Sequence, residues 1–443
     1  MASFSAKALN LLRGKIAQGA IGSLGLRLAS VASAFAASVL FARLLGTEGL
    51  GSYAFAITAV EILLIPAMFG IPVLLGREVP AGLHHHGGSY VRALGKTALL
   101  TVFTLSSLLA LVIALLVMTF GHHLEPGMQQ PLLIALSMLP ILALLWTFEP
   151  LSRSVGRVVL AQFPNYLIRP LLILLLVCAP FLLGLAITPD LAVVLTVVAS
   201  VATLLSAVMI WLRVRPARNA SDSSHRMTTR KLLTTSVPFI IIAALSGLHN
   251  QADILFLGIL SGAHDTGLYR IAHRLASVSN FPHMALMMAL GPVVATLFAQ
   301  NNIDTLRLKV NQALGVSFSG ALFICAVLIG FSWFFLGLFG EDFLQASGTL
   351  TILGLQQSLG VFVLTIQMVL SLTHHEALVA KNMAFSVLMN VGLNLLLIPH
   401  FGTEGAATAT LLTTIFFGIL LAVEAKKKLG FLPSLAVPGP VKK

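Results

Sequence analysis

The chain has 443 residues, of which 57% are hydrophobic and only 9% charged, and its mean hydropathy is +0.97. These values lie far outside the range of water-soluble globular domains, so the composition indicates an integral membrane protein. The net charge of +12 raises the question of nucleic-acid binding, but the placement of the basic residues indicates membrane topology instead.

Apolar runs follow one another along the whole chain, and each is long enough to cross a hydrocarbon core of about 30 Å as a helix. Residues 1–18 precede them and carry Lys and Arg beside Phe and Leu, which predicts an amphipathic segment on the cytoplasmic surface. The pattern predicts an all-α membrane protein of about twelve spans. The expected spans are 19–44, 50–75, 93–120, 131–150, 159–184, 189–212, 232–260, 267–299, 311–340, 346–373, 381–399 and 405–424.

The basic residues lie in every second connection between these spans. All but five of the 27 Lys and Arg residues belong to alternate connections or to the terminal segments. The intervening connections, such as 121–130, 261–266 and 341–345, contain neither Lys nor Arg. This positive-inside pattern predicts that both termini are cytoplasmic.

The longest hydrophilic interval, 213–231, has the composition of a flexible cytoplasmic linker. Six expected spans lie on each side of it, so we expect an N-terminal bundle at 19–212 and a C-terminal bundle at 232–424. A basic cytoplasmic tail, 425–443, completes the chain. Because six is even, both halves begin and end on the same side and are expected to be parallel repeats.

A glycine-rich motif occurs once in each half. "LLGTEGLGSY" at residues 44–53 returns as "LSGAHDTGLY" at residues 260–269, an offset of 216 residues, and each copy joins the first two spans of its half. A tight turn between antiparallel helices needs glycine for positive φ and close backbone approach, while the tyrosine can anchor at the membrane interface. A third copy, "HFGTEGAATAT" at 400–410, joins the last two spans.

Three segments resemble a known family: "ARLLGTEGLGSYAFA", "DILFLGILSGAHDTGLYRIAHRL" and "NVGLNLLLIPHFGTEGAATAT". They are similar to polysaccharide transporters, the O-antigen flippase branch of the multidrug/oligosaccharidyl-lipid/polysaccharide (MOP) exporter superfamily, over essentially the whole chain. The resemblance implies two six-helix bundles around a central cavity, which opens alternately to the cytoplasm and periplasm while an undecaprenyl-diphosphate-linked oligosaccharide is turned over. One departure is "LSLTHHEALVAKN" at 370–382, where the family usually has glycine after Leu-Thr, so the turn there is in doubt.

Five arginines fall outside the cytoplasmic connections. An arginine near the bilayer centre costs about 2.5–3.5 kcal/mol even on a lenient insertion scale, so we expect a water-filled or paired interior around them. The planar guanidinium suits phosphate, which makes most of them candidates for binding a diphosphate, against a snorkelling or structural role. The candidate substrate-binding residues are Arg27, Arg169, Arg270 and Arg274, with Gln162 and Asn165 on the same helix face as Arg169; Arg43 is expected to be an interfacial anchor.

A second set of polar residues is a candidate for coupling or gating: Asp253, Glu61, His249 and Asn250. Antiparallel pairing about the turn near residue 262 predicts Asp253 level with Arg270, either as a static ion pair or as part of the transport cycle. Glu61 and Glu149 are expected either to carry a proton or sodium ion or to neutralise arginines. The polar stripe of the eleventh span is expected to pin neighbouring helices by hydrogen bonds rather than to bind sugar; its members are Asn382, Ser386, Asn390 and Asn394.

The sequence therefore predicts a flippase for polyprenyl-diphosphate-linked repeat units in a bacterial inner membrane, serving O-antigen, capsule or exopolysaccharide synthesis. The expected partners are that lipid-linked oligosaccharide, membrane lipids, a proton or sodium counter-ion, and polysaccharide polymerase and chain-length machinery. No catalytic set, Walker loop or dinucleotide fingerprint occurs, so we expect neither enzymatic activity, cofactor nor metal. One alternative is a drug/cation antiporter, which should place net acid in its cavity. The other is a non-transport membrane protein such as a glycosyltransferase or a glycan polymerase, and a polymerase would typically have a large periplasmic loop.

Overall fold

The computed structural model describes residues 2–121, 124–217 and 227–435, which are helical for most of their length and include no strand. Side chains are described for these residues except 2–21, 24, 238, 241–242, 246, 248–250, 285 and 288–289. The elements in chain order are α1 (Ala2–Met68), α2 (Ile71–Phe120), α3 (Gln129–Leu136), α4 (Met138–Ser154), α5 (Val158–Phe163), the π-helix η2 (Pro164–Ile168), α6 (Arg169–Leu182), α7 (Pro189–Val214), α8 (Thr229–Leu260), α9 (Ala263–Ala276), the 3-10 helix η3 (Ser277–Asn280), α10 (Phe281–Ala299), α11 (Ile303–Gly330), α12 (Ser332–Gly337), the 3-10 helix η4 (Glu341–Ala346), α13 (Ser347–Leu372) and α14 (Glu376–Leu429).

The protein is an all-α, multi-pass membrane protein, which confirms the predicted fold class. Seven helices in the described part of the chain are long and apolar enough to cross a membrane, or eight if the bent pair α3 and α4 counts as one span. Both α1 and α14 run on through a glycine kink, so each contains two of the expected spans. The number of twelve spans stays a prediction.

The chain forms two compact units whose boundary falls inside α8. Unit 1 consists of Met1–Leu45 and Ala56–Ala244, and unit 2 of Gly46–Phe55 and Leu245–Lys443. The start of α8 belongs to unit 1 because it lies directly against the turn before α2: a Cβ atom at Gly70 would lie 2.9 Å from the carbonyl oxygen of Ser236. The predicted division at the 213–231 linker stays a prediction.

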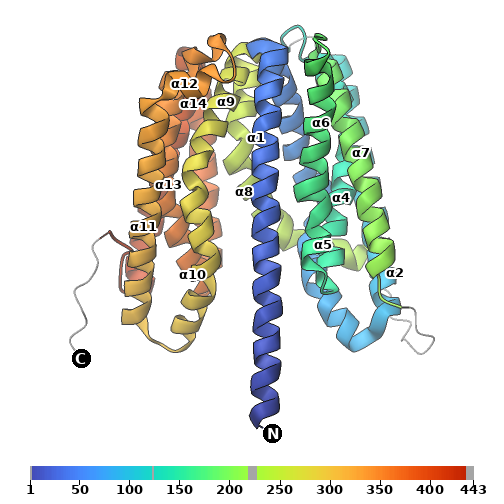
Figure 1. The fold of residues 1–443 in the computed structure, drawn as a ribbon, viewed down its shortest axis with the longest axis vertical. Coiled ribbons are helices and arrows are strands. Elements are labelled where there is room, and N and C mark those ends of the chain that lie inside the picture. Colours follow the sequence, from blue (N-terminus) through green and yellow to red (C-terminus); the bar gives the residue numbers. More distant parts are fainter. Residues whose placement is uncertain (1, 122–123, 218–226, 436–443) are drawn as a thin grey trace. The chain divides into compact units, whose positions relative to one another are not determined.

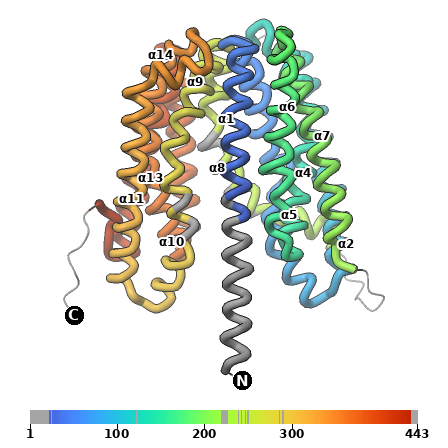
Figure 2. Tube along the Cα trace, viewed as in Figure 1, coloured from blue at the N-terminus to red at the C-terminus, as the bar shows by residue number. Residues whose placement is uncertain are grey.

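Unit 1 is organised around α4, which packs against both α2 and α7 (Figure 1). Lipid provides no hydrophobic driving force between helices, so membrane helices associate through close packing, which small residues allow. Ala98 of α2 and Ala143 of α4 are fully buried, beside the larger Leu94, Leu139 and Leu142. Figure 2 traces α6 and α7 side by side, and these two helices are also in contact.

Unit 2 has a continuous apolar core made by α10, α11, α13 and α14. Val310, Val369, Leu370 and Leu421 are fully buried in it, and Phe417 is almost so. Figure 1 shows α11 and α13 running together, and α13 also packs along α14. The core fixes α14, the helix that carries part of the polar site described below.

All three copies of the glycine motif place their first glycine in a left-handed backbone conformation. The φ angles are +67° at Gly46, +90° at Gly262 and +52° at Gly402. Residues with a Cβ atom adopt such angles at a cost, so glycine is needed where each helix turns back. The predicted positive φ is therefore confirmed in each copy.

The first two copies also contact each other, and they do so reciprocally within unit 2. A Cβ atom at Gly51 would lie 1.7 Å from the carbonyl oxygen of Ala263, and one at Gly267 would lie 2.1 Å from that of Thr47. The offset of 216 residues relates Gly51 to Gly267 and Thr47 to Ala263, so the contact has pseudo-twofold symmetry. Gly51 and Gly267 occur at matching positions of the two copies because two backbones meet there with no room for a side chain.

The turn at residues 372–375 keeps a left-handed residue although the sequence supplies no glycine. His374 follows Thr373 at the position where the family usually has glycine, and its φ is +64°. A non-glycine residue in this conformation is strained by roughly 1–2 kcal/mol. The turn therefore forms without glycine, and His374 carries the strain.

Candidate functional site

The polar residues of unit 1 gather at a π-helical turn between α5 and α6. Its residues, Pro164–Ile168, are followed by an amide at Arg169 that donates to the carbonyl oxygen of Pro164, five residues earlier. Pro170 has no amide hydrogen and cannot donate to a carbonyl of this turn, which favours the local change of pitch. Such π-turns are frequent at functional sites, and this one positions Asn165 and Tyr166.

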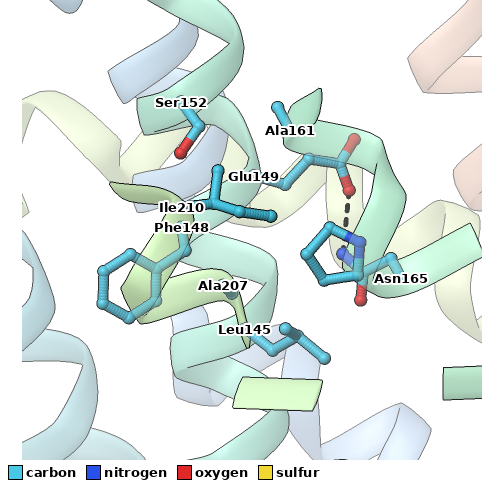
Figure 3. Close-up of a pocket in the computed structure, with 9 residues that line it drawn as sticks. Leu145, Phe148, Glu149, Ser152, Ala161, Asn165, Ala207 and Ile210 are labelled. Carbon is cyan, nitrogen blue, oxygen red and sulfur yellow. Dashed lines mark hydrogen bonds between the residues drawn. The ribbon is translucent and has the colours of Figure 1, made fainter. Parts of the chain in front are cut away.

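Asn165 joins the π-turn to α4. Its side-chain amide donates to the Oε2 atom of Glu149 at 2.9 Å, and the Glu149 side chain is only 8% exposed. Figure 3 shows this bond at one side of a small pocket, which is lined by Leu145, Phe148, Glu149, Ser152, Ala161, Pro164, Asn165, Ala207 and Ile210. Glu149 forms no ion pair with an arginine among the described residues, and its role as an ion carrier or as a counter-charge to an arginine stays a prediction.

Arg27 of α1 lies over the ring of Tyr166, with 5.2 Å between its Cζ atom and the ring centroid. Its Nε atom is buried and has no hydrogen-bond partner among the described residues, and no described carboxylate forms an ion pair with it. A cation over an aromatic face gains some stabilisation without being neutralised. Arg27 therefore keeps its positive charge and a spare donor beside the π-turn.

Two other residues predicted in unit 1 flank this turn in the chain, Gln162 before it and Arg169 after it. Gln162 is 5% exposed, and its Oε1 atom has no hydrogen-bond partner in the described part of the chain. Arg169 is half-buried, as is Glu61 of α1. The turn thus brings Asn165 to Glu149 and Tyr166 to Arg27, while Gln162 presents an unused acceptor.

The polar centre of unit 2 is the carboxylate of Asp253 on α8, which is 9% exposed. Tyr269 donates its hydroxyl to Oδ2 at 2.7 Å, and Asn394 donates its amide to Oδ1 at 2.8 Å. Thr410 also donates to Oδ2, and Asn390 donates to Oδ1 at 3.4 Å. Four donors and no acceptor suit an acceptor-only carboxylate, whose lone-pair sites they occupy.

This network corrects the predicted partner of Asp253. Asp253 and Arg270 form no ion pair, because Tyr269, one residue earlier, occupies the helix face of α9 that meets α8. One residue corresponds to a rotation of about 100° on a helix, which carries the Arg270 side chain away. Tyr269 is 1% exposed and serves this network, so its predicted role as an interfacial anchor is wrong.

The predicted stripe on α14 is confirmed as helix-pinning for two of its members, since Asn390 and Asn394 both bind Asp253 of α8. The side-chain nitrogen of Asn382 and the hydroxyl of Ser386 have no hydrogen-bond partner among the described residues. Arg270 and Arg274 are half-buried. The side chains of His249 and Asn250 lie outside the described residues.

Sequence reasoning missed Tyr166, Tyr269 and Thr410 as members of these two centres. Tyr269 belongs to the repeated motif, so the repeat identified the residue but not its partner. Tyr166 directly follows Asn165, which was predicted. Thr410 ends the third copy of the motif, which likewise did not indicate its partner 157 positions earlier. Within the described ranges, no three His, Cys, Asp or Glu side chains come together in a way that could hold a metal ion.

The comparison with protein families decides the affiliation. Residues 16–298, well over half of the chain, match the family described as "Polysaccharide biosynthesis protein". The chain belongs to this family of polysaccharide biosynthesis proteins. Residues 231–396 of this family member also match the MatE family, which supports its place in the MOP exporter superfamily.

Relatives and solved structures agree with this placement. The probable low-salt glycan biosynthesis flippase Agl15 of Haloferax volcanii is 25% identical over 177 residues, which cover 40% of this polysaccharide biosynthesis protein and only 38% of Agl15. An inward-facing multidrug resistance MATE family transporter is similar with a TM-score of 0.74 at 15% identity, over 90% of this chain and 94% of that one. The lipid II flippase MurJ, in an inward closed conformation, has a TM-score of 0.66 at 16% identity, over 92% and 87%. These structures show the fold that the family member adopts.

Proposed function

We propose that this protein is a flippase that moves a polyprenyl-diphosphate-linked oligosaccharide, such as an undecaprenyl-linked repeat unit, across a bacterial inner membrane by alternating access. The family, the partial similarity to a glycan flippase and the intramembrane arginines support the proposal. The proposed head-group ligands in unit 1 are Arg27, Arg169, Gln162 and Asn165, and those in unit 2 are Arg270 and Arg274.

The single observation that carries the proposal is that Arg27 lies in a membrane helix without an ion-pair partner among the described residues. Its guanidinium lies in a span-forming helix with a buried Nε donor that has no hydrogen-bond partner among the described residues, and none of their carboxylates forms an ion pair with it. Keeping such a group in a membrane is costly unless an anion or water faces it. A diphosphate offers acceptor oxygens in the geometry that the guanidinium fork prefers.

The alternative, a drug/cation antiporter, is favoured by the MATE-like fold and by the buried Asp253. In this conformation, however, four donors occupy the oxygens of Asp253, so a coupling ion or cationic drug would have to displace one of them. The coupling or gating roles of Asp253, Glu61, His249 and Asn250 stay predictions. The basic character of the unit 1 site favours an anionic cargo.

The proposed energy source is the membrane potential. Moving one negative charge outward across an inside-negative membrane releases about 2.3 kcal/mol per 100 mV, so no nucleotide is needed. The expected partners of the transporter are the polymerase and chain-length machinery that use the flipped unit. Transport in vesicles should therefore slow when the potential is clamped to zero and no ion gradient is present, and an unchanged rate would contradict this energy source.

The proposal is tested by the rate at which reconstituted protein exposes a polyprenyl-diphosphate-linked glycan on the far side of vesicles. Arg27→Ala should lower the apparent affinity about 10- to 100-fold, because a hydrogen bond to a charged group contributes roughly 1.5–3 kcal/mol. Arg27→Lys should recover part of the loss, since it restores charge but not the planar fork. Arg43→Ala on the same helix is the control and should transport normally; wild-type transport by Arg27→Ala would refute the assignment.

A further inference from the structure

A second basic site lies in unit 1, apart from the π-turn. A cavity of about 380 Å³ opens between α2 and α7 and is lined by Arg92, Lys96, Leu99, Leu100, Trp211 and Arg215. This volume is within the range of small-molecule sites, roughly 300–1,000 Å³. Three of its six lining residues are cations, and none of the six is an acid.

None of the three cations, Arg92, Lys96 and Arg215, has an ion-pair partner in the part of the chain that the structure describes. Arg92 is fixed in place because its Nε atom donates to the carbonyl oxygen of Pro216, which leaves its terminal N–H groups available to a ligand. Lys96 and Arg215 are exposed. The cavity is therefore a candidate anion-binding site.

The walls of the cavity are rigid. Trp211 is 7% exposed, and its ring packs near Gly95 of α2, where a Cβ atom would lie 3.5 Å from the Cζ2 atom of the indole. The chain leaving α7 also lies directly on α2, since a Cβ atom at Gly88 would lie 2.2 Å from the carbonyl oxygen of Ala217. These contacts hold the end of α7 against α2, so the backbone positions that carry the cations keep their spacing.

The exposed surfaces of the two helices indicate what kind of anion fits. On α2, Lys96 is followed by exposed apolar residues on the same helix face, Leu100 (55%), Phe103 (47%) and Leu111 (58%). Arg215 directly follows α7, whose last turns expose Leu212 (49%) and Leu205 (60%). Positive charge next to an exposed apolar stripe matches a molecule with an anionic head and apolar tails.

We propose that this cavity binds the phosphate of an anionic phospholipid, with the head group among Arg92, Lys96 and Arg215 and the acyl chains along the apolar stripes of α2 and α7. Basic pockets between membrane helices bind phospholipid head groups in this way, and the indole of Trp211 lines the cavity as tryptophans commonly do at the membrane interface. The positive-inside pattern assigns the lipid to the cytoplasmic leaflet. The site is separate from the proposed cargo site and does not depend on the transport activity.

The test is native mass spectrometry of the purified full chain in detergent, titrated with phosphatidylglycerol, phosphatidylcholine and inorganic phosphate. Phosphatidylglycerol should bind the wild type saturably. The variant Lys96→Ala/Arg215→Ala lacks two surface cations, so its affinity for this lipid should fall about 30-fold and its mass spectrum should show one bound lipid fewer. Arg230→Ala/Lys231→Ala removes the same charge from exposed positions outside the cavity and should bind as the wild type does.

Three results would overturn the proposal. The first is equal binding of phosphatidylglycerol by the wild type and the cavity variant, and the second is an equal loss of this binding in both double variants. The third is inorganic phosphate binding as tightly as the lipid, which would assign the cavity to a soluble anion. Lys96→Gln/Arg215→Gln keeps the length of both side chains and serves as a second variant if the alanine protein does not fold. It should show the same loss of phosphatidylglycerol binding.

Discussion

Replacing Asp253 tests the hydrogen-bond network at the polar centre of unit 2. Asp253→Ala removes the acceptor of four donors, but two of them lose little: the hydroxyl of Thr410 can turn to a carbonyl of its own helix, and Asn390 gives up only a long contact of 3.4 Å. Asn394 keeps its existing bond to Asn390 through its second amide hydrogen. The Tyr269 hydroxyl is left buried without a partner, as is one hydrogen of Asn394.

The expected loss of stability follows from these two stranded donors. A buried unsatisfied donor costs roughly 1–3 kcal/mol in soluble proteins, whereas hydrogen bonds between membrane helices average about 0.6 and reach about 1.7 kcal/mol. We therefore expect Asp253→Ala to lower the free energy of unfolding by about 2–4 kcal/mol. Asp253→Asn should cost less than about 1 kcal/mol, because its amide can donate to the Tyr269 and Thr410 hydroxyls, which can also accept.

The assay is equilibrium unfolding of the purified protein in bicelles, with Tyr269→Phe as the partner of a double-mutant cycle. In the Asp253→Ala background, Tyr269→Phe should restore part of the stability, because it removes the stranded hydroxyl. Unfolding of Asp253→Ala at the wild-type free energy would disprove the role of this network, as would Tyr269→Phe adding its full cost to that of Asp253→Ala.

Two backbone predictions follow from the turns. His374→Gly should raise the free energy of unfolding by up to about 1 kcal/mol by relieving the left-handed strain, less the lost contact of His374 with Phe298, and a lower thermal midpoint would count against it. Gly51→Ala and Gly267→Ala should each sharply reduce the yield of folded protein, as measured by size-exclusion chromatography, because their Cβ atoms would lie 1.7 and 2.1 Å from carbonyl oxygens. Gly315→Ala in α11, where nothing lies within 4 Å of the new Cβ, is the matched control and should be neutral or slightly stabilising; the same yield from all three would disprove the close contact.

The sequence predicted the features that have a local cause. Apolar length identified the membrane helices, and the repeated motif identified the turns at which Gly46, Gly262 and Gly402 adopt positive φ. Even the departure from the family pattern marked a special position, since His374 takes the conformation that glycine usually provides. In each case the physical requirement lies within a few residues of the chain.

Partners far apart in the chain could not be predicted. A register error of one residue was enough to assign Arg270 rather than Tyr269 to Asp253, because each residue rotates a helix by about 100°. Asn394 and Thr410 reach Asp253 from α14, and Tyr166 meets Arg27 from a π-turn, so both centres depend on tertiary packing. The boundary inside α8 has the same origin, namely the close approach of its first turns to Gly70.

The most direct test of the central claim, that the intramembrane arginines hold a phosphorylated lipid head group, is a transport measurement with two cargoes. Vesicles containing the purified protein would be offered a polyprenyl-diphosphate-linked oligosaccharide and, separately, a cationic dye with a proton or sodium gradient. We predict that the lipid-linked glycan is flipped in an Arg27-dependent manner while the dye is not moved. Movement of the dye, with no flipping of the glycan, would contradict the account.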